Sequence, residues 1–282
     1  MRPVGAVFGV FEKGKAVQPA LPLREWGEEE PGVFETLRVY GKSIFRLDEH
    51  VKRLEASARS AGLILPRGRA AVRSEILRAL AAWRKTAGPP APGAMMIMRV
   101  AAASGHVWVW VGVRPEQASK FSEGAVLKTT AFRRSPTHAS APESKTNAYQ
   151  NAVLAFFDPP PRPDERLFLD TQGFVAETSV GNIFLIKKKC LMTPPPQGIL
   201  NGITRLFVLE CSRRKGLKAE EVPLTRHDFY NADEVFLTNT SWEILPVREI
   251  DGRSVGHQVP GPWTRKLHQI LKRRIQSECR SL

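Results

Sequence analysis

The sequence contains few cysteines, the residue that is typical of disulfide-bonded and zinc-binding proteins. Only three cysteines, Cys190, Cys211 and Cys279, occur in 282 residues, and no two of them form a CxxC pair. An odd number of widely spaced cysteines argues against a disulfide framework or a zinc site and indicates a reducing compartment. We therefore expect a cytoplasmic protein without a metal site.

Long hydrophobic runs are also absent. No apolar run approaches the roughly 20 residues that a membrane-spanning helix needs. The N-terminal stretch MRPVGAVFGVFEKGK lacks the apolar core and the small-residue cleavage site of a signal peptide. We therefore expect no membrane association. At this length the chain can bury a sizeable core, and we expect two modest domains.

Acidic residues are scarce relative to basic ones. The chain has 28 Asp and Glu against 42 Lys and Arg, which gives a formal net charge of +14. Such a charge would suit nucleic-acid binding, because clustered cations displace counterions from phosphates. The charge is spread over short runs, however, and no helix-turn-helix, RNA-recognition or zinc-finger pattern occurs. Solvated basic faces explain the charge more simply, so we expect no nucleic-acid partner.

Strand and helix patterns alternate along the chain and predict an α+β (mixed α/β) fold. Asp48 is suited to the N-cap of a helix over 49–61, and Gly62 is suited to its C-terminal end. The polar stretch 114–124 is predicted to connect a small N-terminal domain, residues 1–113, to a larger C-terminal domain, residues 125–282. Other predicted helices span 69–85, 146–157, 204–215 and the chain from about 263; predicted strands include 4–10, 32–39, 95–102, 107–113 and 125–132.

The stretch Gly173–Phe184, GFVAETSVGNIF, is the most informative in the chain. Glu177 lies between two apolar runs, Phe174–Ala176 and Ile183–Ile186, whose composition is typical of buried strands. Burying an ionised carboxylate without a partner costs several kcal/mol. Glu177 therefore either lies at a strand end in water or faces a cation, for which a protonated heterocycle would be suitable.

Lys145 precedes an apolar helix pattern in ESKTNAYQNAVLAFF. A cation at the N-terminus of a helix is unfavourable for the helix dipole, although a solvated surface tolerates it. Desolvation beside a fixed neighbour would instead lower the pKa of the amine and suit it to forming a Schiff base. On this pattern alone, an ordinary surface lysine is the simpler interpretation.

Three further groups of polar residues could bind an anion. A glycine-containing turn enters a helix at Ile203 and Thr204, where backbone N–H groups point out of the positive helix end. A buried strand ends in the hydroxyl and amide cluster Thr238–Ser241, and His50 and Arg53 lie on one face of a helix. Helix capping, an ordinary polar turn and a solvated helix face are the structural alternatives.

The order of these motifs is more specific than any one of them. From about Val4 to Val247, the succession FETLRV, FRLDEHVKRLEASA, ESKTxxxY, GFVAETSVGNIF, GILNGITR and DEVFLTNTSWEILPV resembles the fold-type IV pyridoxal-phosphate enzymes. These are the class IV aminotransferases, which include branched-chain and D-amino-acid aminotransferases, with 4-amino-4-deoxychorismate lyase as a non-transaminating relative. The resemblance implies a two-domain fold, pyridoxal 5′-phosphate as the cofactor and a homodimer.

The resemblance also implies roles for individual residues. Lys145 would hold the cofactor as an internal aldimine and then move the proton that the reaction transfers. Glu177 would pair with the protonated pyridine nitrogen and strengthen the ring as an electron sink. The other cofactor contacts implied are the backbone amides of Ile203 and Thr204 and the hydroxyl of Thr240 at the phosphate, Arg53 as the charge partner of the phosphate, and Tyr149 at the ring oxygen.

The substrate region departs from the family pattern. Glu29–Gly32 replaces an aromatic residue and Gly-Asp, and Ser104-Gly105 stands where many relatives have Arg-Gly, so an arginine for the substrate carboxylate is missing there. Arg99 is a possible substitute, and His138 and Ser241 are further candidates for substrate contact. We expect an aminotransferase that acts on a small amino acid and a 2-oxo acid. The lyase is the alternative, and a basic nucleic-acid-binding protein on the same scaffold is a remote one.

Overall fold

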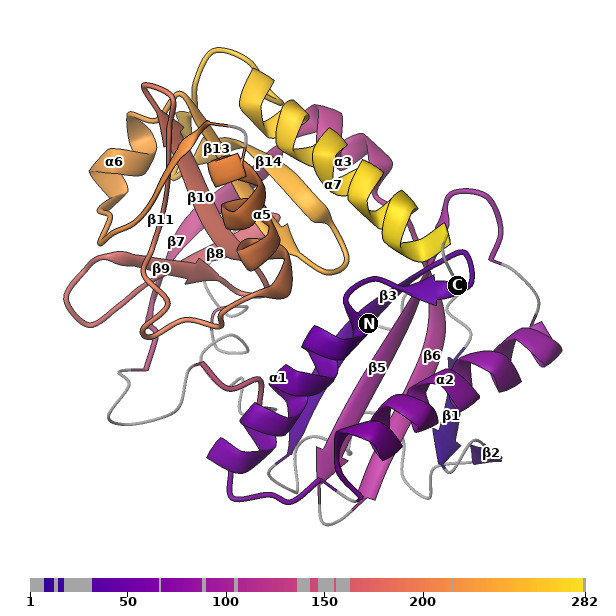
Figure 1. Ribbon diagram of the computed structural model, residues 1–282. Helices are drawn as coiled ribbons and strands as arrows, with labels where there is room; N and C mark the ends of the chain where they lie inside the picture. The colour runs from indigo at the N-terminus through magenta and orange to yellow at the C-terminus, as the bar shows by residue number, and fades with distance from the viewer. Residues whose placement is uncertain are drawn as a thin grey trace. The chain divides into compact units, whose positions relative to one another are not determined.

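The computed structural model describes residues 8–12, 15–17, 32–65, 67–87, 90–103, 106–135, 143–146, 155, 163–214 and 216–280. The chain folds into two compact units, each with its own sheet (Figure 1). Unit 1 comprises Met1–Glu116, Ser144–Ala148 and Ile275–Leu282, and unit 2 comprises Gln117–Glu143 and Tyr149–Arg274. Each unit therefore draws on segments that are far apart in the sequence.

Unit 1 is built on an antiparallel sheet with the strand order β2-β1-β6-β5-β3-β4. Two helices lie along one face of this sheet (Figure 1). The strands are β1 (Phe8–Glu12), β2 (Lys15–Val17), β3 (Val33–Tyr40), β4 (Ser43–Ile44), β5 (Ala94–Ala103) and β6 (His106–Pro115), and the helices are α1 (Leu47–Ser60) and α2 (Gly68–Ala87).

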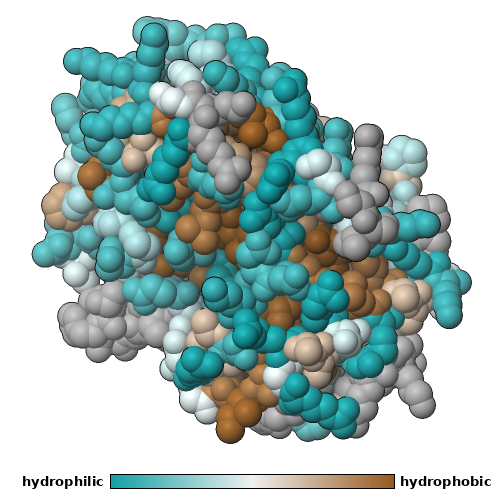
Figure 2. Space-filling view, in the orientation of Figure 1, coloured by the Kyte–Doolittle hydropathy of each residue, from teal (hydrophilic) through white to brown (hydrophobic). Residues whose placement is uncertain are grey.

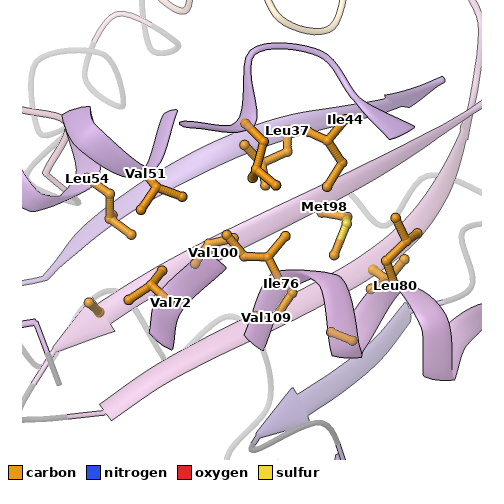
Figure 3. Close-up of a cluster of buried hydrophobic side chains, with 14 of the residues drawn as sticks. Leu37, Ile44, Val51, Leu54, Val72, Ile76, Leu80, Met98, Val100 and Val109 are labelled. Atoms are coloured by element: carbon orange, nitrogen blue, oxygen red, sulfur yellow. The ribbon is translucent and has the colours of Figure 1, made fainter. Parts of the chain in front are cut away.

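The core of unit 1 lies between its sheet and these helices. Leu37 of β3, Met98 of β5 and Val109 of β6 point toward Val51 of α1 and Ile76 of α2, and all five are almost completely buried (Figure 3). The alternation predicted for β3 places every second side chain in this core. Burying each large apolar side chain contributes about 2 kcal/mol, so this layer fixes α1 against β3.

Unit 2 contains a mixed sheet with the strand order β12-β11-β10-β13-β14-β7-β8-β9, and β15 pairs with β14. The pairs β11–β12, β14–β7 and β7–β8 are parallel. The strands are β7 (Ala125–Arg133), β8 (Glu165–Leu169), β9 (Val175–Thr178), β10 (Asn182–Lys187), β11 (Cys190–Thr193), β12 (Lys218–Glu221), β13 (Glu234–Asn239), β14 (Glu243–Ile250) and β15 (Arg253–Ser254). The helices are α3 (Ala118–Glu123), α5 (Ile203–Arg214), α6 (Arg226–Tyr230) and α7 (Pro262–Arg280). The last residues of α7 belong to unit 1.

A buried carboxylate caps the first turn of α7. Glu234 accepts hydrogen bonds from the backbone N–H groups of Trp263 and Thr264, at 3.0 and 2.8 Å, and from the Thr264 hydroxyl at 2.7 Å. A carboxylate is suited to this place because N–H groups at the start of a helix lack partners within the helix. The start of α7 is thereby fixed to β13.

Several predicted elements agree with the structure and one begins differently. The helices predicted over 69–85 and 204–215 are confirmed as α2 and α5. Helix α1 begins at Leu47 rather than Glu49, and Arg46 at φ 56° precedes it, so Asp48 is a first-turn residue and not the N-cap. Asp48 instead accepts a hydrogen bond from Arg73 of α2. Most of the helix predicted over 146–157 lies outside the described residues.

The stretch predicted as the connection between domains contains ordered elements. Arg114 and Pro115 continue β6, and α3 occupies Ala118–Glu123. The boundaries 1–113, 114–124 and 125–282 stay a prediction. Among the described residues, no helix is long and apolar enough to cross a membrane. Hydrophilic residues cover much of the visible face, with smaller hydrophobic areas among them (Figure 2).

Candidate active site

Unit 1 contains a buried charge cluster on β3 and α1. Glu35 accepts hydrogen bonds from Arg53 Nε at 2.7 Å, from Arg53 Nη2 at 2.8 Å and from His50 Nδ1 at 2.8 Å. Burial raises the pKa of Glu35, but the charge and hydrogen bonds of Arg53 and His50 outweigh it and hold the pKa at about 2. Glu35 is therefore an ionised carboxylate, and Arg53 is oriented by a bidentate contact with it.

The pH dependence of stability tests this cluster. Because the pKa of Glu35 is lower in the folded chain than in the unfolded chain, its contribution to stability is complete above the ordinary pKa of 4.5 and is lost as the pH falls toward about 2. We expect Glu35→Gln to lower the free energy of unfolding by about 2 kcal/mol at pH 7, since Arg53 loses a charged partner. Urea unfolding from pH 7 to pH 2.5 measures this. A difference between variant and wild type that does not shrink on acidification would contradict the assignment.

Lys145 is fixed to β3 and α1 through its backbone. Its N–H donates to Ser57 Oγ at 3.0 Å, its carbonyl accepts from the Phe34 N–H at 3.0 Å, and Thr146 forms a bridge with Val33. The half-buried side chain places Nζ 4.5 Å from the centroid of the Phe34 ring. Lys145 is therefore not the loosely attached surface lysine that its local sequence favours.

Arg99 and Lys145 both contact the aromatic ring of Phe34. The guanidinium carbon of Arg99 is 4.1 Å from the centroid of the Phe34 ring, so two cations contact one aromatic side chain of β3. Cation–π contacts of this kind orient side chains without neutralising them. The predicted contact of Arg99 with a substrate carboxylate stays a prediction, as does the predicted contact of Arg53 with a phosphate.

Unit 2 contains the second buried carboxylate, Glu177 on β9. Glu177 is 5% exposed and forms an ion pair with Arg134. Its Oε1 accepts a hydrogen bond from the Leu200 N–H at 3.3 Å, and its Oε2 accepts one from Asn182 Nδ2 at 3.2 Å. Of the two alternatives for Glu177, a strand end in water or a position that faces a cation, the structure shows the second, with a cation from the protein itself. Sequence reasoning missed Arg134, because Arg133-Arg134 resembles an ordinary solvated basic run.

The segment that touches Glu177 continues into the N-terminus of α5. Asn182 donates both to Glu177 and to the Leu200 carbonyl, at 2.7 Å for the latter, and α5 begins at Ile203. Ile203 and Thr204 are buried, and their N–H groups belong to the first turn of the helix, where no partner exists within the helix. The short segment that contains Leu200 thus contacts the Glu177 carboxylate and leads into the positive end of α5.

Arg205 anchors this helix start. Its side chain is completely buried and donates to Asn201 Oδ1 at 3.0 Å, to the Pro194 carbonyl at 2.8 Å and to Glu221 at 2.6 Å. Sequence reasoning assigned no role to Arg205, although the polar residue stands in the apolar helix pattern TRLFVL. Its contacts hold the first turn of α5 in place, which an anion site built from backbone N–H groups requires.

Gly202 allows the close approach between this segment and β10. A Cβ atom at Gly202 would lie 2.2 Å from Asn182 Oδ1. We therefore expect Gly202→Ala to displace the Asn182 amide, weaken its contact with Glu177 and lower the free energy of unfolding by about 2 kcal/mol. Thermal unfolding measures the loss, which reports the close contact and not backbone strain, because φ of Gly202 lies outside the left-handed region. Equal stability of Gly202→Ala and wild type would contradict this geometry.

The turn between β13 and β14 carries Thr240 and Ser241. Asn239 Oδ1 accepts a hydrogen bond from the Trp242 N–H at 2.7 Å, and Asn239 Nδ2 donates to the Val180 carbonyl at 3.3 Å. Val180 belongs to the turn that follows Glu177. The two turns are therefore tied together within unit 2. The predicted contacts of Thr240 with a phosphate and of Ser241 with a substrate stay predictions.

Glu165, the first residue of β8, is a half-buried acid that sequence reasoning did not single out. Burial raises its pKa to about 7, although Ser179, Thr178 and the Val180 N–H oppose the shift. Its Oε2 has no hydrogen-bond partner among the described residues. A raised pKa means that the protonated acid stabilises the fold fully below the ordinary pKa of 4.5, and that this contribution is lost as the pH rises through about 7.

Replacing the Glu165 carboxyl group with an amide of the same shape tests whether its pKa is raised. We expect Glu165→Gln to raise the free energy of unfolding by up to about 3 kcal/mol at pH 8, because the amide resembles the protonated acid. The gain should vanish at pH 4.5. Urea unfolding at both pH values measures it. A variant that is less stable than the wild type at pH 8 would show that the carboxylate is ionised and well partnered.

Two predicted site residues lie in parts of the chain that the structure does not describe. Tyr149, predicted at the ring oxygen of the cofactor, and His138, predicted near the substrate, lie outside the described residues. Ser104-Gly105, where the arginine typical of relatives is missing, is also outside them. The roles of Tyr149 and His138 stay predictions.

Comparison with known proteins places the chain in one family. The family model for amino-transferase class IV matches residues 32–250. The chain is 37% identical over 256 residues to the branched-chain-amino-acid aminotransferase of Pseudomonas aeruginosa, covering 84% of this chain and 82% of that protein. It is 29% identical over 257 residues to the D-alanine aminotransferase of Bacillus licheniformis, covering 88% of each.

Solved structures agree with this assignment. The branched-chain aminotransferase of Thermoproteus uzoniensis with norvaline superposes with a TM-score of 0.80 at 28% identity, covering 94% of this chain and 93% of that chain. A branched-chain amino acid aminotransferase with pyridoxamine 5′-phosphate superposes with a TM-score of 0.81 at 27% identity, covering 95% and 93%. The predicted fold class is confirmed by this similarity. With a family model that spans most of the sequence and relatives that match along it, the chain belongs to the class IV aminotransferase family.

Proposed function

We propose that the protein is a pyridoxal-phosphate-dependent aminotransferase that transfers amino groups between branched-chain amino acids and 2-oxo acids through Lys145. One observation carries most weight. In unit 2, the buried carboxylate of Glu177 and the N-terminus of α5 are joined by the short segment that contains Leu200. This pairing suits a ligand with a cationic ring nitrogen at one end and a phosphate at the other.

The donor set fits pyridoxal 5′-phosphate. Glu177 is buried and already accepts hydrogen bonds from Asn182 and Leu200, which keep the carboxylate oriented. The backbone N–H groups of Ile203 and Thr204 and the hydroxyl of Thr240 would bind the phosphate. Lys145 would hold the cofactor covalently through Nζ. When bound, the cofactor supplies an electron sink that stabilises negative charge on the substrate Cα.

The residues of the chain then have separate tasks. Glu177 would keep a proton on the ring nitrogen, because an ionised carboxylate favours the protonated base beside it. Lys145 Nζ would remove the proton from the substrate Cα and deliver it during transfer, as general acid–base catalysis requires. Phe34 would hold the Lys145 side chain in a half-buried position, since its ring lies 4.5 Å from Nζ.

Similarity to relatives supports branched-chain amino acids as the substrates. The Pseudomonas aeruginosa relative, at 37% identity, is a branched-chain-amino-acid aminotransferase. The D-alanine aminotransferase of Bacillus licheniformis, at 29% identity, makes D-alanine the second candidate. Arg99 is the proposed partner of the substrate carboxylate, and Ser241 is a further proposed contact of the substrate. A homodimer and a cytoplasmic location stay expectations from the family and the cysteine content.

A substrate panel tests the proposal. Purified protein with pyridoxal 5′-phosphate and 2-oxoglutarate would be given L-leucine, L-isoleucine, L-valine or D-alanine in separate reactions, and glutamate formation would be measured. We expect turnover with the three branched-chain substrates at least about 10-fold above that with D-alanine, which corresponds to about 1.4 kcal/mol. Preference for D-alanine would favour the second candidate. Formation of 4-aminobenzoate from aminodeoxychorismate without glutamate would overturn both.

A further inference from the structure

We propose that the buried pair of Glu243 and His268 positions the turn of Thr240, Ser241 and Trp242 for binding the cofactor phosphate. The inference rests on the proposed function, because it takes Thr240 as a phosphate ligand. Glu243 and His268 are positioning residues in this proposal, since neither would touch the cofactor. All of these residues belong to unit 2.

The backbone at Glu243 is strained. Glu243 opens β14 directly after the turn and has φ 66°, in the left-handed region that favours glycine and asparagine. Non-glycine residues persist in this region only when the surrounding structure holds them there, and such residues cluster at functional sites. The side chain must therefore provide an anchor that a glycine would lack.

His268 of α7 provides that anchor. Its Nε2 lies 2.9 Å from Glu243 Oε2, at hydrogen-bond distance, and both side chains are buried. On its other side, the imidazole ring packs against Phe121 of α3, with ring centroids 4.2 Å apart. The ring of His268 is thus held by two contacts, and the hydrogen bond to Glu243 is directional.

The helix that carries His268 is itself fixed. Glu234 of β13 caps the first turn of α7 through the N–H groups of Trp263 and Thr264. The start of α7 is therefore fixed by contacts that do not involve Glu243. The contact between Glu243 and His268 therefore holds one end of the turn in a fixed position relative to α7.

The other end of the turn is held separately. Asn239, which pairs with Glu243 across β13 and β14, donates to the Val180 carbonyl and accepts from the Trp242 N–H. Thr240 therefore lies between two anchored residues, Asn239 and Glu243. Releasing the Glu243 end would let the turn move while the strands on either side stay paired. We expect this to weaken phosphate binding more than folding.

Three variants separate positioning from simple stabilisation. His268→Leu removes the hydrogen bond, whereas His268→Gln keeps an amide donor that can reach the carboxylate. Glu243→Gly removes the carboxylate and relieves the backbone strain, so this variant should fold even if His268→Leu does not. The full-length chain, freed of cofactor, would be titrated with pyridoxal 5′-phosphate and with pyridoxal, which lacks the phosphate. Absorbance gives both dissociation constants, and thermal unfolding is recorded in parallel.

The ratio of the two dissociation constants is the decisive quantity. We expect His268→Leu and Glu243→Gly to weaken binding of pyridoxal 5′-phosphate about 10-fold while pyridoxal binding changes little, and His268→Gln to restore the wild-type ratio to within about 3-fold. Equal weakening for both ligands, or a lower melting temperature with an unchanged ratio, overturns the inference.

Thr240→Val distinguishes the inference from the function on which it rests. If Thr240→Val lowers the preference for the phosphorylated ligand and the His268 and Glu243 variants do not, only the positioning role is overturned. If the wild-type chain binds the two ligands equally, or Thr240→Val leaves the preference unchanged, the phosphate role of Thr240 fails and the inference fails with it.

Discussion

Lys145→Ala is expected to reduce amino transfer by at least about 10³-fold, because the variant loses both the covalent attachment of the cofactor and the group that moves the substrate proton. The fold should survive. Lys145 is held to unit 1 by its backbone N–H and carbonyl, which contact Ser57 and Phe34 and which the substitution leaves in place. Loss of activity without loss of stability would therefore report the chemistry of Nζ.

Absorbance and turnover measure this effect together. The wild-type protein should carry a yellow band near the visible edge that changes with pH, and Lys145→Ala should lack it. Lys52→Ala is the matched control, since Lys52 is an exposed lysine of α1 in the same unit. A Lys145→Ala variant that keeps both the yellow band and turnover would overturn the proposed function. A wild-type protein that stays colourless with added pyridoxal 5′-phosphate would do the same.

Local sequence patterns predicted most of the elements that surround the site. Alternation in β3 and helical periodicity in α2 and α5 arise from packing against a single neighbouring layer, so a short window of sequence contains the signal. The start of α1 was missed by two residues because Asp48, which looked like an N-cap, bonds Arg73 of α2 instead. A side chain that can serve either a helix end or a tertiary contact is ambiguous until the fold is known.

The sequence predicted only some members of the two buried charge clusters. The apolar neighbours of Glu177 left two alternatives, a strand end in water or a buried carboxylate that faces a cation, because burial without a cation is costly; the structure shows the second. The identity of that cation did not follow, since Arg134 comes directly after β7 in the sequence and only the pairing of β7 with β8, and of β8 with β9, brings it near. Glu35 was likewise hidden: it belongs to the quoted motif FETLRV, but its bonds to His50 and Arg53 depend on how α1 packs on β3.

Glu177→Gln is the second large effect that we expect. Glutamine has the same shape but carries no charge, so it cannot favour a proton on the ring nitrogen, and turnover should fall by about 10³-fold. Binding of the cofactor to Lys145 should persist, because Nζ is unchanged. Turnover and the yellow band, measured on the same sample, separate the two effects. Unchanged turnover would remove Glu177 from the proposed catalytic residues.

The ion pair between Arg134 and Glu177 affects the stability of Glu177→Gln, and it also provides a decisive control for the role of Glu177. Because Arg134 is the ion-pair partner of Glu177, the single substitution leaves a guanidinium without its counter-charge and should lower stability as well as turnover. The double variant Arg134→Gln/Glu177→Gln removes both charges, so stability should recover toward that of the wild type. If Glu177 acts on the ring nitrogen, turnover stays low in the double variant. If Glu177 serves only to balance Arg134, turnover returns together with stability.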